Sequence, residues 1–436
     1  MDKHLQAPVL QGTLGAPSSK SEAHRALIAA ALSCLYGGTP SPRRVRCTDL
    51  NEDMEATARC LSALGAGMER VGEDFIVTPI TTLPLRAELD CGESGSTLRF
   101  LLPVCCALGS LPAAPAGFTV SLTGRGRLPE RPLSPLYEEL VAHGAILSPM
   151  GTNPLTVQGK LTAGDYVLDG GISSQFVSGL LLALPLLSGD STLTVTGRIE
   201  SAPYVAMTLD AIRGVTGAVA GELPAFRITG RDSTPSLPPA TESVTVGGDW
   251  SGAAFFLAAG VLGRAGTSVT VTGLSPQSRQ GDRAIVAILR TMGGDIREGS
   301  DGFTASPSAL RGCVIDAAQV PDLVPILAVA ASVAEGVTSI VGASRLRFKE
   351  SDRLATVTRL LTALGGDVTE TDDGLIIRGV PRLKGGMADA AGDHRIAMSA
   401  AVAATLCDGD VTVTGAECVA KSYPRFWEEF ERLSRR

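Results

Sequence analysis

The sequence predicts an α/β fold made of repeated units in two lobes, and three observations support this. An apolar helical stretch that opens on polar residues and leads to a glycine and a short strand recurs six times along the 436 residues. The closing strands of later copies, at 192–197, 267–273 and 411–415, are nearly identical in sequence. A period of about 70 residues indicates one supersecondary unit copied around an axis. A chain of this length also exceeds one ordinary hydrophobic core.

The six apolar stretches each open on residues that can hydrogen-bond or carry charge. They begin, in chain order, at Lys20-Ser21, at residues 94–96, at residues 173–175, at Trp250-Ser251, at residues 320–322 and at residues 393–395. The first turn of a helix attracts anions because its N–H groups lack partners and the helix dipole is positive there. If these openings converge, they form an anion-binding site.

A second helix followed by two strands alternates with the apolar stretches. These helices, at 57–65, 136–144, 209–217, 285–294 and 356–366, end in glycine, which is typical of a helix C-cap. The β segments that follow, at 67–79, 145–159, 218–230, 295–307 and 367–379, contain turn residues. Each unit then holds two helices and about four strands. No G-x-G-x-x-G follows a strand, so the pattern is not that of a Rossmann fold.

The two lobes are predicted to meet in the Pro- and Ser-rich stretch 233–241. We expect one lobe of three repeats at 20–236, and a second lobe formed by 1–19 together with 237–436. The leading segment is strand-like and crosses between lobes near 17–19. A cleft between lobes is a usual place for a small-molecule site.

Composition excludes several classes of protein. A net charge of −7 argues against a nucleic-acid partner, which needs a basic surface. The nine cysteines never form C-x-x-C, so a disulfide scaffold and a zinc site are both disfavoured. No apolar run reaches the 18 residues that would span a membrane, and residues 26–35 lie too far from Met1 for a signal peptide. We predict a soluble cytoplasmic protein with no membrane contact.

Cationic side chains gather at the repeat openings of this acidic chain. They are Lys20, Arg25, Arg99, Arg127, Lys349, Arg353, Arg395 and Lys421. Taken alone, Lys20 and Arg25 are also compatible with an ordinary helix start that carries solvated charges. Eight cations around one site would instead imply a highly anionic set of ligands.

Carboxylates at two of these openings are candidates for proton transfer. Asp322 interrupts an apolar stretch, where an unpaired aspartate would cost several kcal/mol. Glu350 lies between Lys349 and Arg353, which are predicted to be one helical turn apart on one face. A solvated, charge-rich helix start is the alternative interpretation of that segment. The chain has no G-x-S-x-G, which argues against a serine hydrolase.

Together these motifs resemble the 5-enolpyruvylshikimate-3-phosphate synthase family. The matching segments run in order over essentially the whole chain, at 20–25, 93–99 (ESGSTLR), 127–131 (RLPER), 173–176 (SSQF), 320–322 (VPD), 349–354 (KESDRL), 393–398 (DHRIAM) and 420–424 (AKSYP). The resemblance implies the enolpyruvyl transferase fold, an inside-out α/β barrel with two lobes and six βαβαββ units. It also implies transfer of the enolpyruvyl group of phosphoenolpyruvate to the 5-hydroxyl of shikimate 3-phosphate, with loss of phosphate.

The resemblance assigns expected roles to individual residues. Shikimate 3-phosphate, held mainly by the 20–236 lobe, is expected to contact Lys20, Ser21, Arg25, Ser173, Ser174, Gln175, Ser201, Tyr204, Asp322, Arg345 and Lys349. Phosphoenolpyruvate is expected to contact Lys20, Gly95, Arg127, Gln175, Arg353, Arg395 and Lys421. The expected catalytic residues are Asp322, as base on the 5-hydroxyl, Glu350, which serves the enol methylene, Lys20 and His394. A monomer with no metal and no cofactor, inhibited by glyphosate, is implied as well.

Three positions depart from the usual family pattern. Glu93 stands where many members have Asn, Phe100 where many have Pro, and Arg345 replaces a polar residue. Two rival functions stay open. The sister UDP-N-acetylglucosamine enolpyruvyl transferases typically have Lys-Asn at the first motif and a cysteine in the loop at 124–132, and this chain has neither. A non-catalytic anion-binding module would do better without Asp322 and Glu350 in its cleft.

Overall fold

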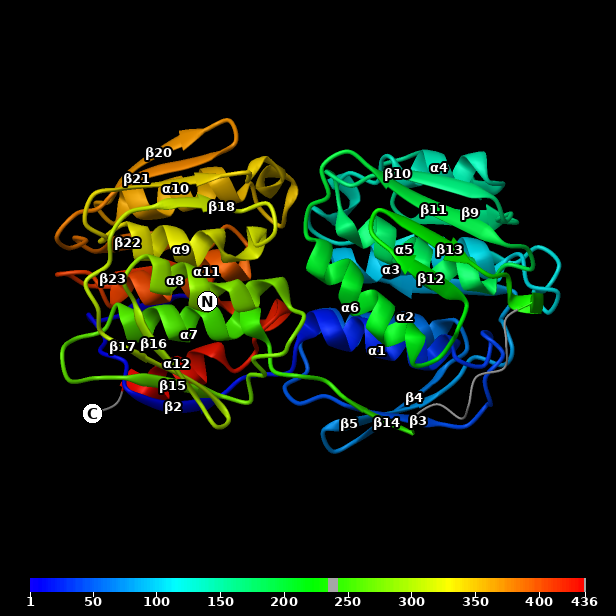
Figure 1. The fold of residues 1–436 in the computed structure, drawn as a ribbon, viewed down its shortest axis with the longest axis horizontal. Coiled ribbons are helices and arrows are strands. Elements are labelled where there is room, and N and C mark those ends of the chain that lie inside the picture. The colour runs from blue at the N-terminus through cyan, green and yellow to red at the C-terminus, as the bar shows by residue number, and fades with distance from the viewer. Residues whose placement is uncertain (234–241, 435–436) are drawn as a thin grey trace. The chain divides into compact units, whose positions relative to one another are not determined.

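The computed structural model describes residues 1–233 and 242–434, which form two compact units (Figure 1). The first unit is Lys20–Val246, and the second combines Met1–Ser19 with Gly247–Arg436. The predicted boundary at 236/237 falls among residues 234–241, which lie outside the described residues. The first unit continues beyond it, because β14 (Ser243–Thr245) pairs in parallel with β3 (Arg43–Arg46).

The first unit has three sheets of four strands, in the orders β14-β3-β5-β4, β6-β7-β9-β8 and β10-β11-β13-β12. Its other strands are β4 (Gly67–Val71), β5 (Asp74–Thr78), β6 (Arg86–Asp90), β7 (Thr119–Thr123), β8 (Ala145–Leu147), β9 (Leu155–Gly159), β10 (Asp165–Asp169), β11 (Ser191–Thr196), β12 (Val219–Glu222) and β13 (Ala225–Ile228). Its helices are α1 (Lys20–Leu32), α2 (Glu52–Ala63), α3 (Gly95–Leu108), α4 (Leu136–Ala142), α5 (Ser174–Ala183) and α6 (Ala202–Arg213).

The second unit also has three sheets, in the orders β16-β17-β15-β2, β18-β19-β21-β20 and β1-β23-β22. The strands are β1 (Lys3–Leu5), β2 (Gly12–Gly15), β15 (Val269–Thr272), β16 (Asp295–Gly299), β17 (Gly302–Ser306), β18 (Val314–Asp316), β19 (Val337–Val341), β20 (Asp367–Thr371), β21 (Gly374–Arg378), β22 (Gly386–Asp389) and β23 (Val411–Thr414). The helices are α7 (Trp250–Val261), α8 (Ile285–Thr291), α9 (Val324–Ala331), α10 (Arg353–Ala363), α11 (His394–Ala404) and α12 (Phe426–Ser434). The leading segment therefore supplies strands to two of these sheets.

The repeated unit is seen most simply in the sheet that contains β6 to β9. Strands β6 and β7 are parallel and are joined through α3, and β8 and β9 then form an antiparallel pair beside β7. A crossover helix is what a parallel pair requires, whereas a short turn suffices for an antiparallel pair. The predicted βαβαββ unit is confirmed, and six sheets follow from its repetition.

In each unit the most apolar helices lie inside and the sheets outside, whereas helices such as α4 and α6 keep an exposed face (Figure 1). Helices α7 and α9 are apolar all round and almost every residue in them is buried, as expected for helices covered on every side. Strands alternate between buried and exposed positions, for example β11 and β23, so one face of each sheet packs on the helices. Because polar residues cannot lie along such helices, they gather at the helix ends.

Some predicted helix limits are wrong, because the sequence pattern missed the capping residues. Helix α2 begins at Glu52, where the Asn51 side chain accepts a hydrogen bond from the Met54 N–H. Helix α10 begins at Arg353 behind the N-cap Asp352. Lys349 therefore lies outside the helix with extended backbone, φ −86° and ψ −162°. The prediction that Lys349 and Arg353 share one helical face is wrong.

Candidate active site

In the first unit, Arg25 on α1 lies where α1, α3, α5 and α6 meet. Its guanidinium donates to Thr208 Oγ1 at 2.7 Å, to the Tyr204 carbonyl at 2.9 Å and to the Ser21 carbonyl at 2.6 Å. The Phe100 ring of α3 lies 4.8 Å from it, within reach of a cation–π contact. The side chain is 3% exposed.

All of these hydrogen-bond acceptors are neutral, and Arg25 forms no ion pair within the described residues. Burial lowers the pKa of Arg25 to about 10. A guanidinium buried without a counter-ion is costly, so the free protein stores unfavourable electrostatic energy here. An anionic ligand would relieve it.

In the same unit, Gln175 at the start of α5 is hydrogen-bonded to residues at the start of α3. Its Oε1 accepts from Arg99 at 3.1 Å, and its Nε2 donates to Ser96 Oγ at 2.9 Å. The preceding Gly95 leaves room for guanidinium groups, because a Cβ there would lie 2.8 Å from the nearest nitrogens of Arg99 and Arg131. The structure therefore brings the openings of α3 and α5 together.

The remaining predicted residues of this unit lie at helix or loop ends. Lys20, the first residue of α1, pairs with Asp53 at 2.8 Å. Ser173 caps α5 by accepting from the Gln175 N–H, while Ser174 and Ser201 are buried. Ser201 precedes α6 in the left-handed region, with φ 54°. Arg127 is exposed in its loop and forms no ion pair within the described residues.

In the second unit, Arg353 joins three carboxylates. Its Nε lies 2.8 Å from Asp393, one terminal nitrogen lies 2.7 Å from Asp322, and the other lies 2.7 Å from Glu350. The Arg353 side chain is 1% exposed and that of Asp393 is 0% exposed. Burial alone would lower the pKa of Arg353, but the three carboxylates raise it above its usual value. Although burial also opposes ionisation of Asp393, Arg353 holds the pKa of Asp393 below its usual value.

Three cationic side chains from three segments lie beside Asp322. Besides Arg353, its carboxylate lies 3.3 Å from Lys349 Nζ and 3.2 Å from Arg395. Burial lowers the pKa of Lys349 to about 8; Asp322 opposes this shift, whereas the charges of Arg353 and Arg345 add to it. Asp322 itself keeps 22% of its side-chain surface exposed. It is thus accessible, and it lies among three cationic side chains.

Three further predicted residues lie at nearby segment ends. Arg345 donates to the Ala318 carbonyl at 3.0 Å, and Lys421 donates to the Gly392 carbonyl at 2.8 Å. His394 is the first residue of α11 and is 2% exposed. The second unit therefore places Asp322, Lys349, Glu350, Arg353 and Arg395 in one network of charges.

The EPSP synthase family model, described as 3-phosphoshikimate 1-carboxyvinyltransferase, matches residues 6–430. The chain belongs to this family. A 3-phosphoshikimate 1-carboxyvinyltransferase of Clostridium kluyveri is 42% identical over 427 residues, covering 97% of this chain and 95% of the relative. The EPSP synthase structure of Acinetobacter baumannii superposes with a TM-score of 0.76 at 25% identity, over 99% and 98% of the two chains. The enolpyruvyl transferase NikO of Streptomyces tendae, at 20% identity and TM-score 0.75 over 99% and 97%, shows the shared fold.

The resemblance stated from the motifs is therefore confirmed, and so is the enolpyruvyl transferase fold. The chain is an enzyme that transfers the enolpyruvyl group of phosphoenolpyruvate to shikimate 3-phosphate, in the biosynthesis of aromatic amino acids. The family match favours this reaction over the UDP-N-acetylglucosamine reaction of the sister family and over a non-catalytic module.

Several residues that contact the predicted site residues were not themselves predicted from the sequence. Thr208 and Phe100 contact Arg25, Asp53 pairs with Lys20, and Asp393 pairs with Arg353. Asp393 and Asp53 could have been recognised as capping or first-turn residues, since acidic residues are favoured at an N-cap and in the first turn of a helix. Nothing in the sequence marks Thr208, because a threonine in an amphipathic helix is ordinary.

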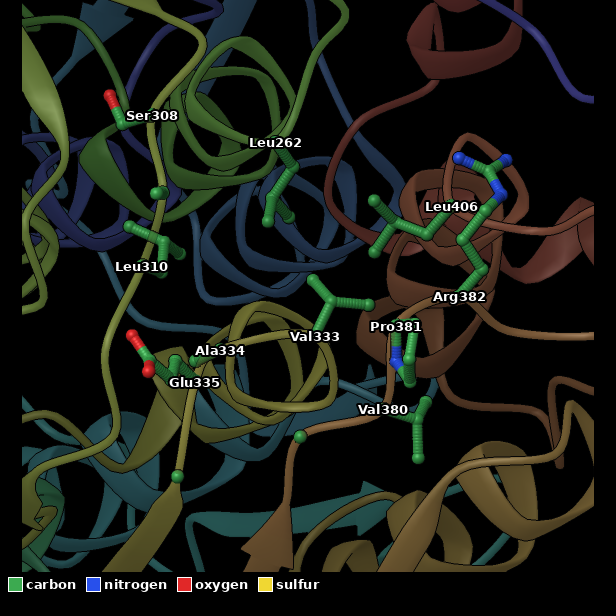
Figure 2. Close-up of a pocket in the computed structure, with 13 residues that line it drawn as sticks. Leu262, Ser308, Leu310, Val333, Ala334, Glu335, Val380, Pro381, Arg382 and Leu406 are labelled. Atoms are coloured by element: carbon green, nitrogen blue, oxygen red, sulfur yellow. The ribbon is translucent and has the colours of Figure 1, made fainter.

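A pocket of about 540 Å³ lies elsewhere in the second unit (Figure 2). Leu262, Val333 and Leu406 line it from the segments that follow α7, α9 and α11. It therefore lies at the C-terminal ends of these helices, whose partial negative charge disfavours anions. None of the predicted site residues lines it.

Two further features of residues 1–233 and 242–434 bear on other functions. Neither stretch contains a group of three or more His, Cys, Asp or Glu side chains placed to hold a metal ion. In those same stretches no helix is long and apolar enough to cross a membrane.

Proposed function

We propose that the charged side chains of both units serve the same pair of substrates in the EPSP synthase reaction. Shikimate 3-phosphate would be bound by Ser21, Arg25, Ser173, Ser174, Ser201, Tyr204, Arg345 and Lys349. Phosphoenolpyruvate would be bound by Gly95, Arg127, Arg353, Arg395 and Lys421. Two residues, Lys20 and Gln175, would contact both substrates. The Arg25 environment supports the first assignment, because a buried guanidinium with only neutral acceptors is suited to a carboxylate or phosphate.

The observation that carries the catalytic proposal is the position of Asp322. An accessible carboxylate beside Lys349, Arg353 and Arg395 can accept a proton from the 5-hydroxyl while the cations hold the anionic substrates. The oxygen then attacks the second carbon of phosphoenolpyruvate as the methylene carbon takes a proton from the protonated carboxyl group of Glu350. A tetrahedral intermediate forms, and phosphate leaves when that proton is lost again.

Glu350 is proposed to move the proton of the methylene carbon. It would give the methylene carbon a proton in the addition step and take that proton back in the elimination step, and in the free enzyme it lies 2.7 Å from Arg353. Lys20 and His394 are proposed to assist, Lys20 by stabilising negative charge on the departing phosphate. The enzyme is further proposed to be a cytoplasmic monomer inhibited by glyphosate.

Turnover with shikimate 3-phosphate and phosphoenolpyruvate, followed by release of inorganic phosphate, tests the activity. Parallel reactions with UDP-N-acetylglucosamine as acceptor should release none. Release only with the nucleotide sugar would overturn the assignment. Light scattering after size exclusion tests the monomer, and inhibition by glyphosate that phosphoenolpyruvate relieves tests the inhibitor.

A further inference from the structure

A fully buried carboxyl group that the reaction scheme does not use lies in the second unit. Asp282, in a 3₁₀ turn (Gly281–Ala284) before α8, is 0% exposed. Its Oδ2 accepts a short hydrogen bond from the Ser251 hydroxyl in the first turn of α7. Its Oδ1 has no hydrogen-bond partner within the described residues.

The surrounding backbone fixes this carboxyl group in place. The neighbouring Gln280 side chain accepts from the Trp250 N–H at 3.0 Å and donates to the Gly248 carbonyl at 2.8 Å. The turn is therefore attached to both sides of the α7 start. A rigidly held, half-satisfied carboxyl group is costly in a stable interior, which points to a role beyond packing.

Charged groups face Asp282 from the elements around it. Asp249 comes from the α7 N-cap, Asp322 from the 3₁₀ turn (Pro321–Leu323) before α9, and Arg395 from α11. Burial and the charges of Asp322 and Asp249 raise the pKa of Asp282, whereas Arg395 and the Ser251 hydroxyl lower it. The resulting pKa is about 6. The carboxyl group thus gains or loses its proton near neutral pH.

We propose that Asp282 is a positioning residue of this EPSP synthase: its carboxyl group is held at the start of α7, which packs against the turn of Asp322 and against α11 with Arg395, and when it loses its proton it weakens the hold of Arg395 on phosphoenolpyruvate. This inference rests on the proposed function, in which Arg395 contacts that substrate. Below about pH 6 Asp282 is neutral and adds no negative charge beside Arg395, which pairs with Asp322. Above that pH a second negative charge faces Arg395, so affinity for an anion falls. By linkage, binding phosphoenolpyruvate raises the pKa of Asp282 and draws a proton onto it.

The test compares the KM for phosphoenolpyruvate of the wild-type enzyme and Asp282→Asn between pH 5 and pH 8. Taking the ratio of the two values cancels the ionisation of phosphoenolpyruvate itself. We expect the wild-type to variant ratio to be near one at pH 5 and to rise to about threefold to tenfold at pH 8, as a screened charge would produce. The change should be centred near pH 6. Calorimetry in two buffers of different ionisation enthalpy should show less proton uptake on binding in the variant.

A second variant separates charge from structure. Ser251→Ala removes the hydrogen bond that favours the ionised carboxyl group, so the midpoint of the KM change should move to higher pH. Asp295→Asn, which removes a carboxylate paired with Arg297 on a strand of the same unit, is the matched control and should give a flat ratio. If Asp282→Asn does not fold, Ser251→Ala carries the test.

A flat ratio for Asp282→Asn in a folded protein, or an unmoved midpoint in Ser251→Ala, would overturn the inference. Arg395→Ala distinguishes this failure from failure of the proposed function. If Arg395→Ala leaves the KM for phosphoenolpyruvate unchanged, the assignment of Arg395 is wrong. If it raises that KM while the Asp282 ratio is flat, only the role of Asp282 is wrong.

Discussion

Arg25 in the first unit and Arg353 in the second are both guanidinium groups buried at helix openings, yet their surroundings are opposite. Arg25 is held by hydroxyl and carbonyl oxygens and lies against an aromatic ring. Arg353 is held by Asp322, Glu350 and Asp393. The difference supports the proposal that Arg25 binds an anionic substrate group, whereas Arg353 already has carboxylate partners within the protein.

Under the proposed function, the first unit would supply binding of anionic groups and the second unit the proton transfer. A positive site without counter-ions binds anionic groups but has no base. A site in which carboxylates and cations alternate offers both a proton acceptor and groups that attract anions. Asp322, with Lys349, Arg353 and Arg395 around it, is the clearest such position.

The largest expected effect comes from removing the base of the second unit. Asp322→Asn should lower kcat by about 10²-fold to 10⁴-fold, the usual contribution of a general base, while the variant still binds both substrates. Steady-state turnover and equilibrium binding would measure this, with circular dichroism to confirm the fold. Turnover within a few-fold of wild type would show that Asp322 is not the base.

Loss of Arg353 should cost stability as well as activity. Arg353→Met leaves Asp393, which is 0% exposed, without its counter-ion, and breaking a buried ion pair typically costs about 3–5 kcal/mol. Denaturant unfolding of the two proteins gives this difference in free energy. A loss below about 1 kcal/mol would contradict the view that this network is a balanced, structural one.

Arg25→Met should give the opposite combination. The KM for shikimate 3-phosphate should rise about 10-fold to 100-fold, since charged hydrogen bonds are worth about 1.5–3 kcal/mol. The free energy of unfolding should change by less than about 1 kcal/mol, because no carboxylate loses its partner. The same unfolding and kinetic assays apply. If Arg25→Met is destabilised as much as Arg353→Met, the comparison between the two sites fails.

A smaller effect is expected at the tight turn before α3. In Gly95→Ala the new Cβ would displace the Arg99 and Arg131 guanidinium groups, whose nitrogens lie 2.8 Å from its position. Because both are ends of flexible side chains, the protein should remain folded. The KM for phosphoenolpyruvate should rise about tenfold, and inhibition by glyphosate should weaken, as expected for loss of one charged contact. An unchanged KM would place phosphoenolpyruvate away from this turn.

The smallest effect is a shift in pH dependence. Lys349 has a pKa of about 8, so it is charged below pH 8 and neutral above it. The KM for shikimate 3-phosphate should therefore rise as the pH rises through 8. Lys349→Arg keeps its charge at these pH values and should move that rise to higher pH, by at least about one pH unit. A KM profile identical in both proteins would remove Lys349 from the substrate contacts.

The part of the structure that could be predicted from the sequence differs between the fold and the site. The repeat was evident because helix and strand periodicities are local, and the glycine-terminated strands mark each copy at a near-constant spacing. Asp322 was found for the same reason, since an aspartate in an apolar stretch stands out without any neighbour being known. The family motifs then supplied the names of the substrates.

The arrangement of the charges was decided by tertiary structure alone. The sequence placed Lys349 and Arg353 on one helix, whereas the chain bends at Lys349 and the two side chains reach Asp322 from different segments. Nor could it show that Arg25 has neutral partners while Arg353 has acidic ones, because the deciding partners are distant in the sequence: Thr208 is 183 positions from Arg25, and Asp322 is 31 positions from Arg353. Local pattern records which side chains a helix opening offers. What neutralises them depends on which openings the repeated sheets bring together, and that is a property of the packed units.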